Sequence, residues 1–319
     1  MAVTFTQQDK KATELIGEVR NSRADSHTRD IRRHAQKSKD YFHFLRNSPK
    51  CYKVSQMSEV KSAVSLETCH AVSVTKEKAE DSWEQHAEWW QEGFTEGADE
   101  EYEEQIIPLA RGLLTGYKKI LDVGTGEGQI SRVLVESGAE TVIGVDPTHN
   151  QILEANRRGG GPVYLRGKSE QLPFSESSFD AAIACLVFEH IEAMDSAIEE
   201  IARVLKPDAK FLFFLNHPLV QTPGSGWIDD QILDPPEKYW RIGPYLTEVM
   251  EMEEVDNGVF LPFVHRPLSR YVNALSSAGL VISSMHEPSP PEGFLKRSLQ
   301  FGDAALIPRL LLIEAVRVA

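Results

Sequence analysis

The sequence predicts an α/β protein with a doubly wound sheet, and two patterns support that prediction. Between residues 118 and 216, short and nearly continuous apolar segments alternate with amphipathic segments. Apolar strands of this kind fit a parallel sheet that is buried on both faces, with the amphipathic segments as covering helices. The second pattern is the turn "DVGTGEG", which follows the first apolar segment directly. A turn so rich in glycine connects a strand to a helix and lets a ligand approach the backbone.

The individual elements follow from hydrophobic periodicity, with Gly and Pro as boundaries. Strands are expected at residues 118–124, 141–146, 162–167, 179–188, 210–216, 281–288 and 307–316. Helices are expected at residues 83–94, 99–114, 128–138, 150–159, 195–207 and 267–280. Pro207 is expected to end the fifth of these helices, because proline cannot continue a helix.

Two segments depart from the alternation. Residues 1–78 are polar and lack a sustained apolar face, so we expect partial helix and much disorder there. Residues 217–265 are rich in Pro, Gly and aromatic residues and are too long for an ordinary connection. We predict that they form a lid insertion within a single domain spanning residues 79–319.

Charge and cysteine content narrow the class of protein. Residues 1–80 hold 15 Lys+Arg and 10 Asp+Glu, which leaves 19 and 38 of the chain's 34 and 48 for residues 81–319. A body with a net charge of −19 would repel a phosphate backbone, so a nucleic acid partner is not expected. The three cysteines lack metal-ligand spacing and fit a reducing compartment. Without a signal-like start or an apolar run of roughly 18–20 residues, we expect a cytoplasmic protein without a membrane span.

The glycine spacing bears on the ligand. Dinucleotide-binding turns follow G-x-G-x-x-G, whereas Gly124, Gly126 and Gly128 alternate here and Gln129 fills the position of the third dinucleotide glycine. Asp122 stands two residues before the first glycine. Its carboxylate would repel a pyrophosphate but attract an ammonium or sulfonium group. The pattern therefore disfavours a nicotinamide cofactor and favours a nucleoside that carries a cationic amino acid.

A second acidic residue, Asp146, ends the next strand, "TVIGVD". In doubly wound sheets a carboxylate at this point accepts hydrogen bonds from ribose hydroxyls. The structural alternative is a helix N-cap ahead of "PTHNQIL". Its place one strand after the glycine turn favours the ribose role.

Four blocks, in order, carry a resemblance to a known family: "LDVGTGEGQ", "VIGVDPT", "EQLPFSESSFDAAIACLVFEHI" and "IEEIARVLKPDAKFLF". They resemble the class I S-adenosylmethionine-dependent methyltransferases, especially the branch with the ubiquinone/menaquinone-biosynthesis enzymes. The resemblance covers residues 80–319 and is most specific over 118–216. It implies a Rossmann-like, seven-stranded sheet with an antiparallel last strand, and S-adenosylmethionine as the cofactor.

The resemblance also implies a cofactor site. The methionine and ribose moieties would be lined by Asp122, Gly124, Thr125, Gly126 and Gly128. The ribose hydroxyls would be held by Asp146, next to Pro147, while Ser169 and Glu170 would flank the adenine and Cys185 and Leu186 would lie near the sulfonium. One departure concerns the adenine. Relatives read "GDAExLPF", but this chain reads "GKSEQLPF", so Lys168 stands in place of an acid and cannot accept a hydrogen bond.

Methyl transfer from a sulfonium needs an acceptor held in line, and orientation supplies much of the acceleration. A base helps when the acceptor is a hydroxyl or an acidic carbon, and histidine suits neutral pH. The candidates near the strand ends are His190, His217 and His265. His217 is preferred because it directly follows the fifth strand and opens the insertion. Each could instead be a helix cap or a packing residue.

Aromatic residues of the insertion could wall an acceptor pocket or pack a lid: Trp227, Tyr239, Trp240, Tyr245 and Phe260. The tryptophans of residues 83–94 could likewise cover a pocket or pack in the core. We therefore predict transfer of a methyl group to a small organic acceptor. The alternatives are a non-catalytic cofactor-binding module and methylation of RNA or protein. The sequence assigns neither the acceptor nor an oligomeric state.

Overall fold

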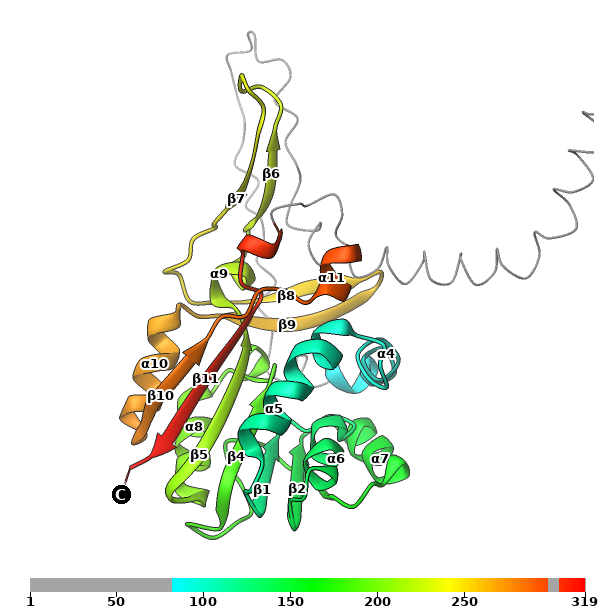
Figure 1. The fold of residues 1–319 in the computed structure, drawn as a ribbon, viewed down its shortest axis with the longest axis vertical. Helices are drawn as coiled ribbons and strands as arrows, with labels where there is room; N and C mark the ends of the chain where they lie inside the picture. Colours follow the sequence, from blue (N-terminus) through cyan, green and yellow to red (C-terminus); the bar gives the residue numbers. More distant parts are fainter. Residues whose placement is uncertain (1–81, 298–303, 319) are drawn as a thin grey trace, which may run out of the picture.

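A seven-stranded sheet forms the centre of the computed structural model, which describes residues 82–297 and 304–318 (Figure 1). The strand order is β10-β11-β5-β4-β1-β2-β3. These strands span Lys119–Val123 (β1), Thr141–Asp146 (β2), Val163–Arg166 (β3), Phe179–Cys185 (β4), Leu205–Asn216 (β5), Leu280–His286 (β10) and Leu310–Arg317 (β11). The predictions for residues 1–78 lie outside the described residues.

The directions of the strands confirm the predicted sheet. Parallel pairing joins β3 to β2, β2 to β1, β1 to β4 and β4 to β5. The last strand, β11, is inserted between β5 and β10 and runs antiparallel to both. This is the Rossmann-like sheet with an antiparallel last strand that the sequence predicts.

Helices cover both faces of the sheet, and each face has its own apolar core. One face packs against α5 and α6, the other against α8 and α10, while α7 packs on β3 through Tyr164. The helices span Ala87–Gly93 (α4), Ile107–Leu114 (α5), Gln129–Glu136 (α6), His149–Arg158 (α7), Met194–Val204 (α8) and Leu268–Ser277 (α10). Because both faces are covered, strands such as β4 and β5 carry nearly continuous apolar runs.

The insertion consists of a short helix and two hairpins. Its elements are α9 (Pro218–Gln221), β6 (Gly226–Asp230), β7 (Glu237–Arg241), β8 (Val249–Asp256) and β9 (Val259–His265). The β6–β7 hairpin projects away from the body, whereas β8–β9 crosses the top of the sheet near α4 (Figure 1). Short elements also fill the connection from β10 to β11, namely α11 (Glu292–Arg297) and η3 (Ala304–Leu306).

Proline explains one difference between prediction and structure. The single helix expected over 99–114 is instead a π-helical turn, η1 (Tyr102–Ile106), followed by α5. Pro108 has no N–H with which to bond the preceding turn, and the N–H of Ile107 bonds Tyr102 O, five residues back. The helix expected over 195–207 is present, but it ends at Val204, three residues before Pro207, and Pro207 lies within β5.

No helix within residues 82–297 and 304–318 combines the length and apolar character needed to cross a membrane.

Candidate active site

A cavity of about 600 Å³ lies at the carboxyl ends of β1, β2 and β4, the edge where doubly wound sheets bind their ligands. The segment from Trp83 to Thr95 contributes the opposite wall. Ten of the eleven residues predicted to bind cofactor line this cavity: Asp122, Gly124, Thr125, Gly126, Asp146, Pro147, Ser169, Glu170, Cys185 and Leu186. Gly128 is not among the lining residues.

The glycine turn is held in a conformation that other residues rarely adopt. Gly124, Gly126 and Gly128 have φ values of +70°, +56° and +86°. A Cβ at Gly124 would lie 2.4 Å from a Val187 methyl group, and one at Gly128 would lie 2.2 Å from the Tyr164 hydroxyl oxygen. Gly124 and Gly128 thus permit close packing against Val187 and Tyr164, and Gly124 and Gly126 also leave the cavity wall without side chains.

Asp122 lies at the end of β1 and is almost fully buried. Its Oδ2 accepts hydrogen bonds from Thr125 Oγ1 and Ser131 Oγ, each at 2.7 Å. Burial raises the pKa of Asp122 to about 6, against the lowering effect of these bonds. The carboxylate therefore stabilises the turn and supplies negative potential to the cavity at neutral pH, as a cationic ligand would require.

Asp146 ends β2 and joins two turns at the cavity wall. Its Oδ2 accepts from Gly126 N at 3.0 Å, and its Oδ1 accepts from Thr148 N at 2.8 Å. Burial raises its pKa above the ordinary value. A carboxylate so fixed is suited to accept hydrogen bonds from neighbouring hydroxyls, and it also ties the glycine turn to the start of α7.

The part of the cavity next to the carboxyl end of β3 holds the residues expected near adenine. Ser169 Oγ donates to Glu170 Oε2 at 3.0 Å, and Arg166 Nε donates to Pro147 O at 2.9 Å. Lys168, the residue that departs from the family pattern, also lines the cavity.

The end of β4 presents a thiol and a strained residue. Cys185 Sγ lies 3.8 Å from the Tyr102 hydroxyl, and burial raises the pKa of the Cys185 thiol far above its ordinary value. The thiol is therefore neutral and is not a nucleophile. Leu186 has a φ of +54°, a left-handed conformation that a residue with a Cβ seldom adopts.

Beyond Cys185 the cavity is walled by large side chains from separate parts of the chain. Trp83 packs edge-on against Trp90 and His190, with ring centroids 5.8 and 4.8 Å apart. Met250 of β8 also lines the cavity and is the one described residue of the insertion that does so. The five aromatic residues of the insertion that were expected as wall candidates do not line it.

The three candidate histidines have different surroundings. His217 is buried outside the cavity wall: its Nδ1 accepts from Leu219 N at the start of α9, and its Nε2 lies 2.8 Å from Glu287 Oε1. His265 is also buried outside the wall, with Nε2 2.8 Å from Tyr245 O. The position of His217 therefore does not support the sequence-based preference for it as a base, because α9 begins inside the body and uses the ring as its cap.

His190 is the candidate histidine that lines the cavity. It belongs to the 3₁₀ turn η2 (Phe188–His190), which follows β4. Its Nδ1 lies 2.7 Å from Pro262 O, and a carbonyl only accepts, so Nδ1 carries the proton and Nε2 is left as an acceptor. The ring also packs against Phe263, and loss of water around it lowers the pKa of His190 to about 4.

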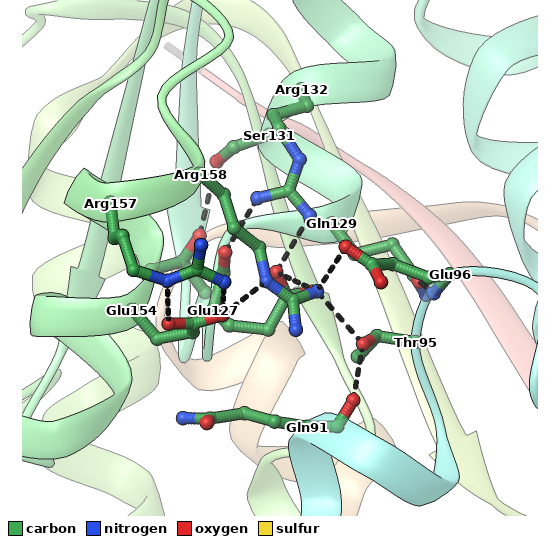
Figure 2. A network of polar contacts seen from close by, with 12 residues as sticks. Gln91, Thr95, Glu96, Glu127, Gln129, Ser131, Arg132, Glu154, Arg157 and Arg158 are labelled. Atoms are coloured by element: carbon green, nitrogen blue, oxygen red, sulfur yellow. Dashed lines mark hydrogen bonds and ion pairs between the residues drawn. The ribbon is translucent and has the colours of Figure 1, made fainter. Parts of the chain in front are cut away.

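A buried ionic network anchors the segment from Trp83 to Thr95, the covering segment, to the glycine turn (Figure 2). Glu127 Oε2 lies 2.6 Å from Arg132 Nη2 and 2.9 Å from Arg158 Nη1. The same Arg158 nitrogen contacts Thr95 Oγ1 at 2.9 Å and Glu96 Oε1 at 3.4 Å. Arg158, from the end of α7, thereby joins the glycine turn to the residues that follow α4.

Glu84 gives the covering segment a second anchor. Its two carboxylate oxygens accept from His149 N and Asn150 N, at 2.7 and 3.0 Å, at the start of α7. The unpaired N–H groups and the dipole of a helix N-terminus favour a carboxylate there. Sequence reasoning missed Glu84, Tyr102, Gln151 and Met250 as cavity residues, because no local motif surrounds them. The spacing of Trp83 and Trp90 did carry a signal, as a helix that could cover a pocket.

The fold and the cavity together define a doubly wound α/β protein whose strand edge is built for a nucleoside-bearing ligand. Comparison with known proteins sharpens this class. Residues 121–213 match the family described as "Methyltransferase domain". A solved S-adenosylmethionine-dependent methyltransferase from Mesorhizobium loti is 27% identical, with a TM-score of 0.57, and the match covers 66% of this chain and 96% of that one.

Two methyltransferases known from their sequences are also similar to part of this chain. An uncharacterized methyltransferase of Synechocystis sp. is 31% identical over 135 residues, which is 41% of this chain and 59% of that protein. A malonyl-[acyl-carrier protein] O-methyltransferase of Enterobacter lignolyticus is 28% identical over 105 residues, or 33% of this chain and 41% of that protein. The chain thus spans about half the length of these relatives.

These matches support a class I S-adenosylmethionine-dependent methyltransferase domain within the chain, with S-adenosylmethionine as its cofactor. The resemblance to the S-adenosylmethionine-dependent methyltransferases that was read from the sequence is confirmed, whereas the matches assign no branch of that family. The residues present fit this cofactor, because two buried carboxylates, Asp122 and Asp146, line the cavity beside a wall that lacks side chains at Gly124 and Gly126.

Proposed function

We propose that this protein transfers a methyl group from S-adenosylmethionine to a small organic acceptor by in-line displacement. The observation that carries the proposal is the continuity of one cavity, which runs from Asp122 and Asp146 past Cys185 to Trp83 and His190. One end suits a cationic nucleoside, and the other offers apolar walls with one neutral imidazole. A site enclosed on this scale suits a small acceptor better than a polymer.

When bound, S-adenosylmethionine supplies an electrophilic methyl group on a positively charged sulfur. The proposed role of Asp122 is to complement that positive charge, and that of Asp146 is to accept from the ribose hydroxyls. Ser169 and Glu170 would flank the adenine, while Cys185 and Leu186 would lie beside the reacting sulfur. Because the thiol of Cys185 is neutral, it would not compete with the acceptor for the methyl group.

His190 is proposed to orient the acceptor and receive its proton. With Nδ1–H engaged by Pro262 O, Nε2 is the nitrogen available to a hydroxyl or amine. A pKa of about 4 keeps the ring neutral at physiological pH, so it accepts a hydrogen bond without first losing a proton. Such a base is weak, and we therefore assign most of the rate acceleration to orientation.

Calorimetric titration tests the cofactor assignment. S-adenosylmethionine and S-adenosylhomocysteine should bind one to one, and NAD should not. Asp146→Asn should weaken both by roughly 10- to 100-fold, because a charged acceptor of hydroxyl hydrogen bonds is lost. Asp229→Asn, on the projecting hairpin, is the matched control and should bind normally. Equal binding of NAD, or an unaltered affinity in Asp146→Asn, would refute the assignment.

Labelled methyl transfer tests the acceptor class. We expect transfer to small hydroxylated apolar compounds, with His190→Gln reducing kcat by roughly 10- to 100-fold and leaving cofactor affinity unchanged. Cofactor binding with no transfer to any of a broad panel would instead favour a non-catalytic binding module. Labelling of bulk RNA or protein would favour a macromolecular acceptor, which the acidic body disfavours.

We also propose that the protein is cytoplasmic. Cys185 is a free, buried thiol, consistent with a reducing cytoplasm.

A further inference from the structure

Arg266 lies between β9 and α10 with a side chain that is only about 1% exposed. Its guanidinium donates three hydrogen bonds to the backbone of one loop. Nη1 lies 3.0 Å from Phe188 O, and Nη2 lies 2.7 Å from Ile191 O and 2.9 Å from Glu192 O. Residues 188–192 form the acceptor-side loop, and three of them, His190, Ile191 and Glu192, line the cavity.

Two further contacts hold the same loop at its remaining positions. The carboxylate of Glu189 accepts from Asn216 N at the end of β5. The ring of His190 donates through Nδ1 to Pro262 O in β9. Each residue of the acceptor-side loop is therefore tied to β5, to β9 or to Arg266. Pro262 and Arg266 each lie more than 70 residues away in the sequence from the loop residues that they contact.

The chemistry of arginine suits this place. Three carbonyls at different angles need several N–H groups in a fixed plane, which a guanidinium has and an ammonium lacks. The fourth contact, from Nε to Glu248 Oε1 at 3.0 Å, balances the buried charge. Glu248 in turn lies 3.6 Å from Arg270, which pairs with Asp195 of α8. A buried charge with this many partners is expensive to build and has no role in the cofactor end of the cavity.

We propose that Arg266 is a positioning residue that holds the acceptor-side loop and thereby fixes the ring of His190 at the cavity wall. This inference rests on the proposed function of His190. In this arrangement the β8–β9 hairpin is a fixed wall of the acceptor site, joined to the body through Arg266 and Pro262.

The first test reads His190 directly and needs no acceptor. Long-range proton–nitrogen correlation spectra report the tautomer of each histidine, and a His190→Gln spectrum identifies the signal of His190. The wild-type ring should be a single Nδ1–H tautomer. In Arg266→Lys and Arg266→Met we expect a mixture of tautomers and a pKa of His190 raised by about one unit, as water reaches the ring. Affinity for S-adenosylhomocysteine should stay within about threefold of wild type.

Arg270→Met is the matched control, because Arg270 contacts Asp195 and Glu248 but, among the described residues, makes no hydrogen bond to the acceptor-side loop. It should leave the tautomer of His190 unchanged. If Arg266→Met does not fold, Arg266→Lys and the milder Glu248→Gln decide the question. A wild-type tautomer and pKa of His190 in folded Arg266 variants would overturn the inference.

The second test separates positioning from the proposed function. With an acceptor in hand, Arg266→Lys should lower kcat by roughly 100-fold, the size expected when a reacting group is displaced by about 1 Å. Failure of the wild-type protein to bind S-adenosylhomocysteine or transfer methyl groups would refute the proposed function. The spectra of His190 would still show whether Arg266 positions its ring.

Discussion

The end of the cavity formed by the glycine turn and the end formed by the acceptor-side loop are assembled from different kinds of chain. The glycine-turn end uses consecutive residues at the tips of adjacent parallel strands, such as Asp122 in β1 and Asp146 in β2. The acceptor end brings together Trp83, His190 and Met250, which come from the covering segment, the turn after β4 and the insertion. One end is local in sequence and the other is not.

This difference shows which part of the site the fold dictates. Parallel strands that lie side by side must end at the same edge, so their terminal carboxylates converge wherever such a sheet forms. Nothing comparable requires an aromatic side chain from residue 83 to meet a histidine at residue 190. Their meeting depends on anchors such as Glu84 on α7 and Arg266 on the acceptor-side loop.

The largest expected effect breaks the glycine-turn end. Gly124→Ala combines a left-handed backbone with a collision against Val187, so we expect a loss of roughly 2–5 kcal/mol in the free energy of unfolding. Affinity for S-adenosylhomocysteine should fall with it. Urea unfolding and calorimetry measure the two effects.

Gly138→Ala is the matched control, because Gly138 also has a positive φ, +98°, but no atom within 4 Å of a built Cβ. It should show only the backbone penalty, about 1–2 kcal/mol. Val187→Ala combined with Gly124→Ala should recover part of the difference. Equal losses at Gly124 and Gly138 would mean that the collision with Val187 is relieved without penalty.

The next effect tests the anchor in Figure 2. Glu127→Ala removes the buried carboxylate that Arg132 and Arg158 share, although Arg158 keeps Glu154 at 2.7 Å, and we expect a loss of about 2–4 kcal/mol in the free energy of unfolding. Glu96→Ala removes an exposed partner of the same Arg158 and should change stability by about 0.5 kcal/mol or less. If both variants unfold at the same urea concentration, the network is not the anchor described above.

A smaller effect at the acceptor end depends on pH. Burial raises the pKa of Glu189 from 4.5 to about 7, so the folded protein takes up this proton before the unfolded chain does. Its contribution to stability therefore falls as pH rises from about 4.5 to about 7. Glu189→Gln should remove this dependence. The free energy of unfolding of the variant, compared with that of wild type, should therefore be higher at pH 8 than at pH 4.5 by roughly 2–3 kcal/mol.

Chemical unfolding of both proteins across that pH range measures the difference. His190, whose pKa is lowered, has the opposite dependence between about 4 and 6.5, but it is common to both proteins and cancels. A constant gap between wild type and Glu189→Gln would contradict the raised pKa.

The smallest effect concerns the hairpin that projects from the body. Trp240 packs against Trp227, and its indole N–H has no hydrogen-bond partner within the described part of the chain. Trp240→Phe should change stability by about 1 kcal/mol or less and leave cofactor affinity unchanged. A large loss of affinity would show that β6–β7 contributes to the cavity, contrary to its place in Figure 1.

Most of the sheet could be predicted because its signals are local. The apolar runs of β1 to β5 and the glycine turn stand in the sequence regardless of what packs on them. The π-helical turn at Tyr102–Ile106 was missed, although Pro108 was visible, because proline permits several outcomes and the neighbours of the helix select one. The preference for His217 over His190 lacks structural support for a related reason: proximity to a strand end does not say which way a ring points.

The sequence by itself determined the class of fold and the glycine-turn end of the cavity, since alternating apolar segments, a bare glycine turn and two strand-terminal acids are all short-range patterns. Only the tertiary structure decided the end formed by the acceptor-side loop. It turned His217 into a helix cap, brought His190 to the cavity and buried Arg266 behind it. The physical reason is that hydrogen bonds between residues such as His190 and Pro262 join segments 72 positions apart, and no local periodicity records such a contact.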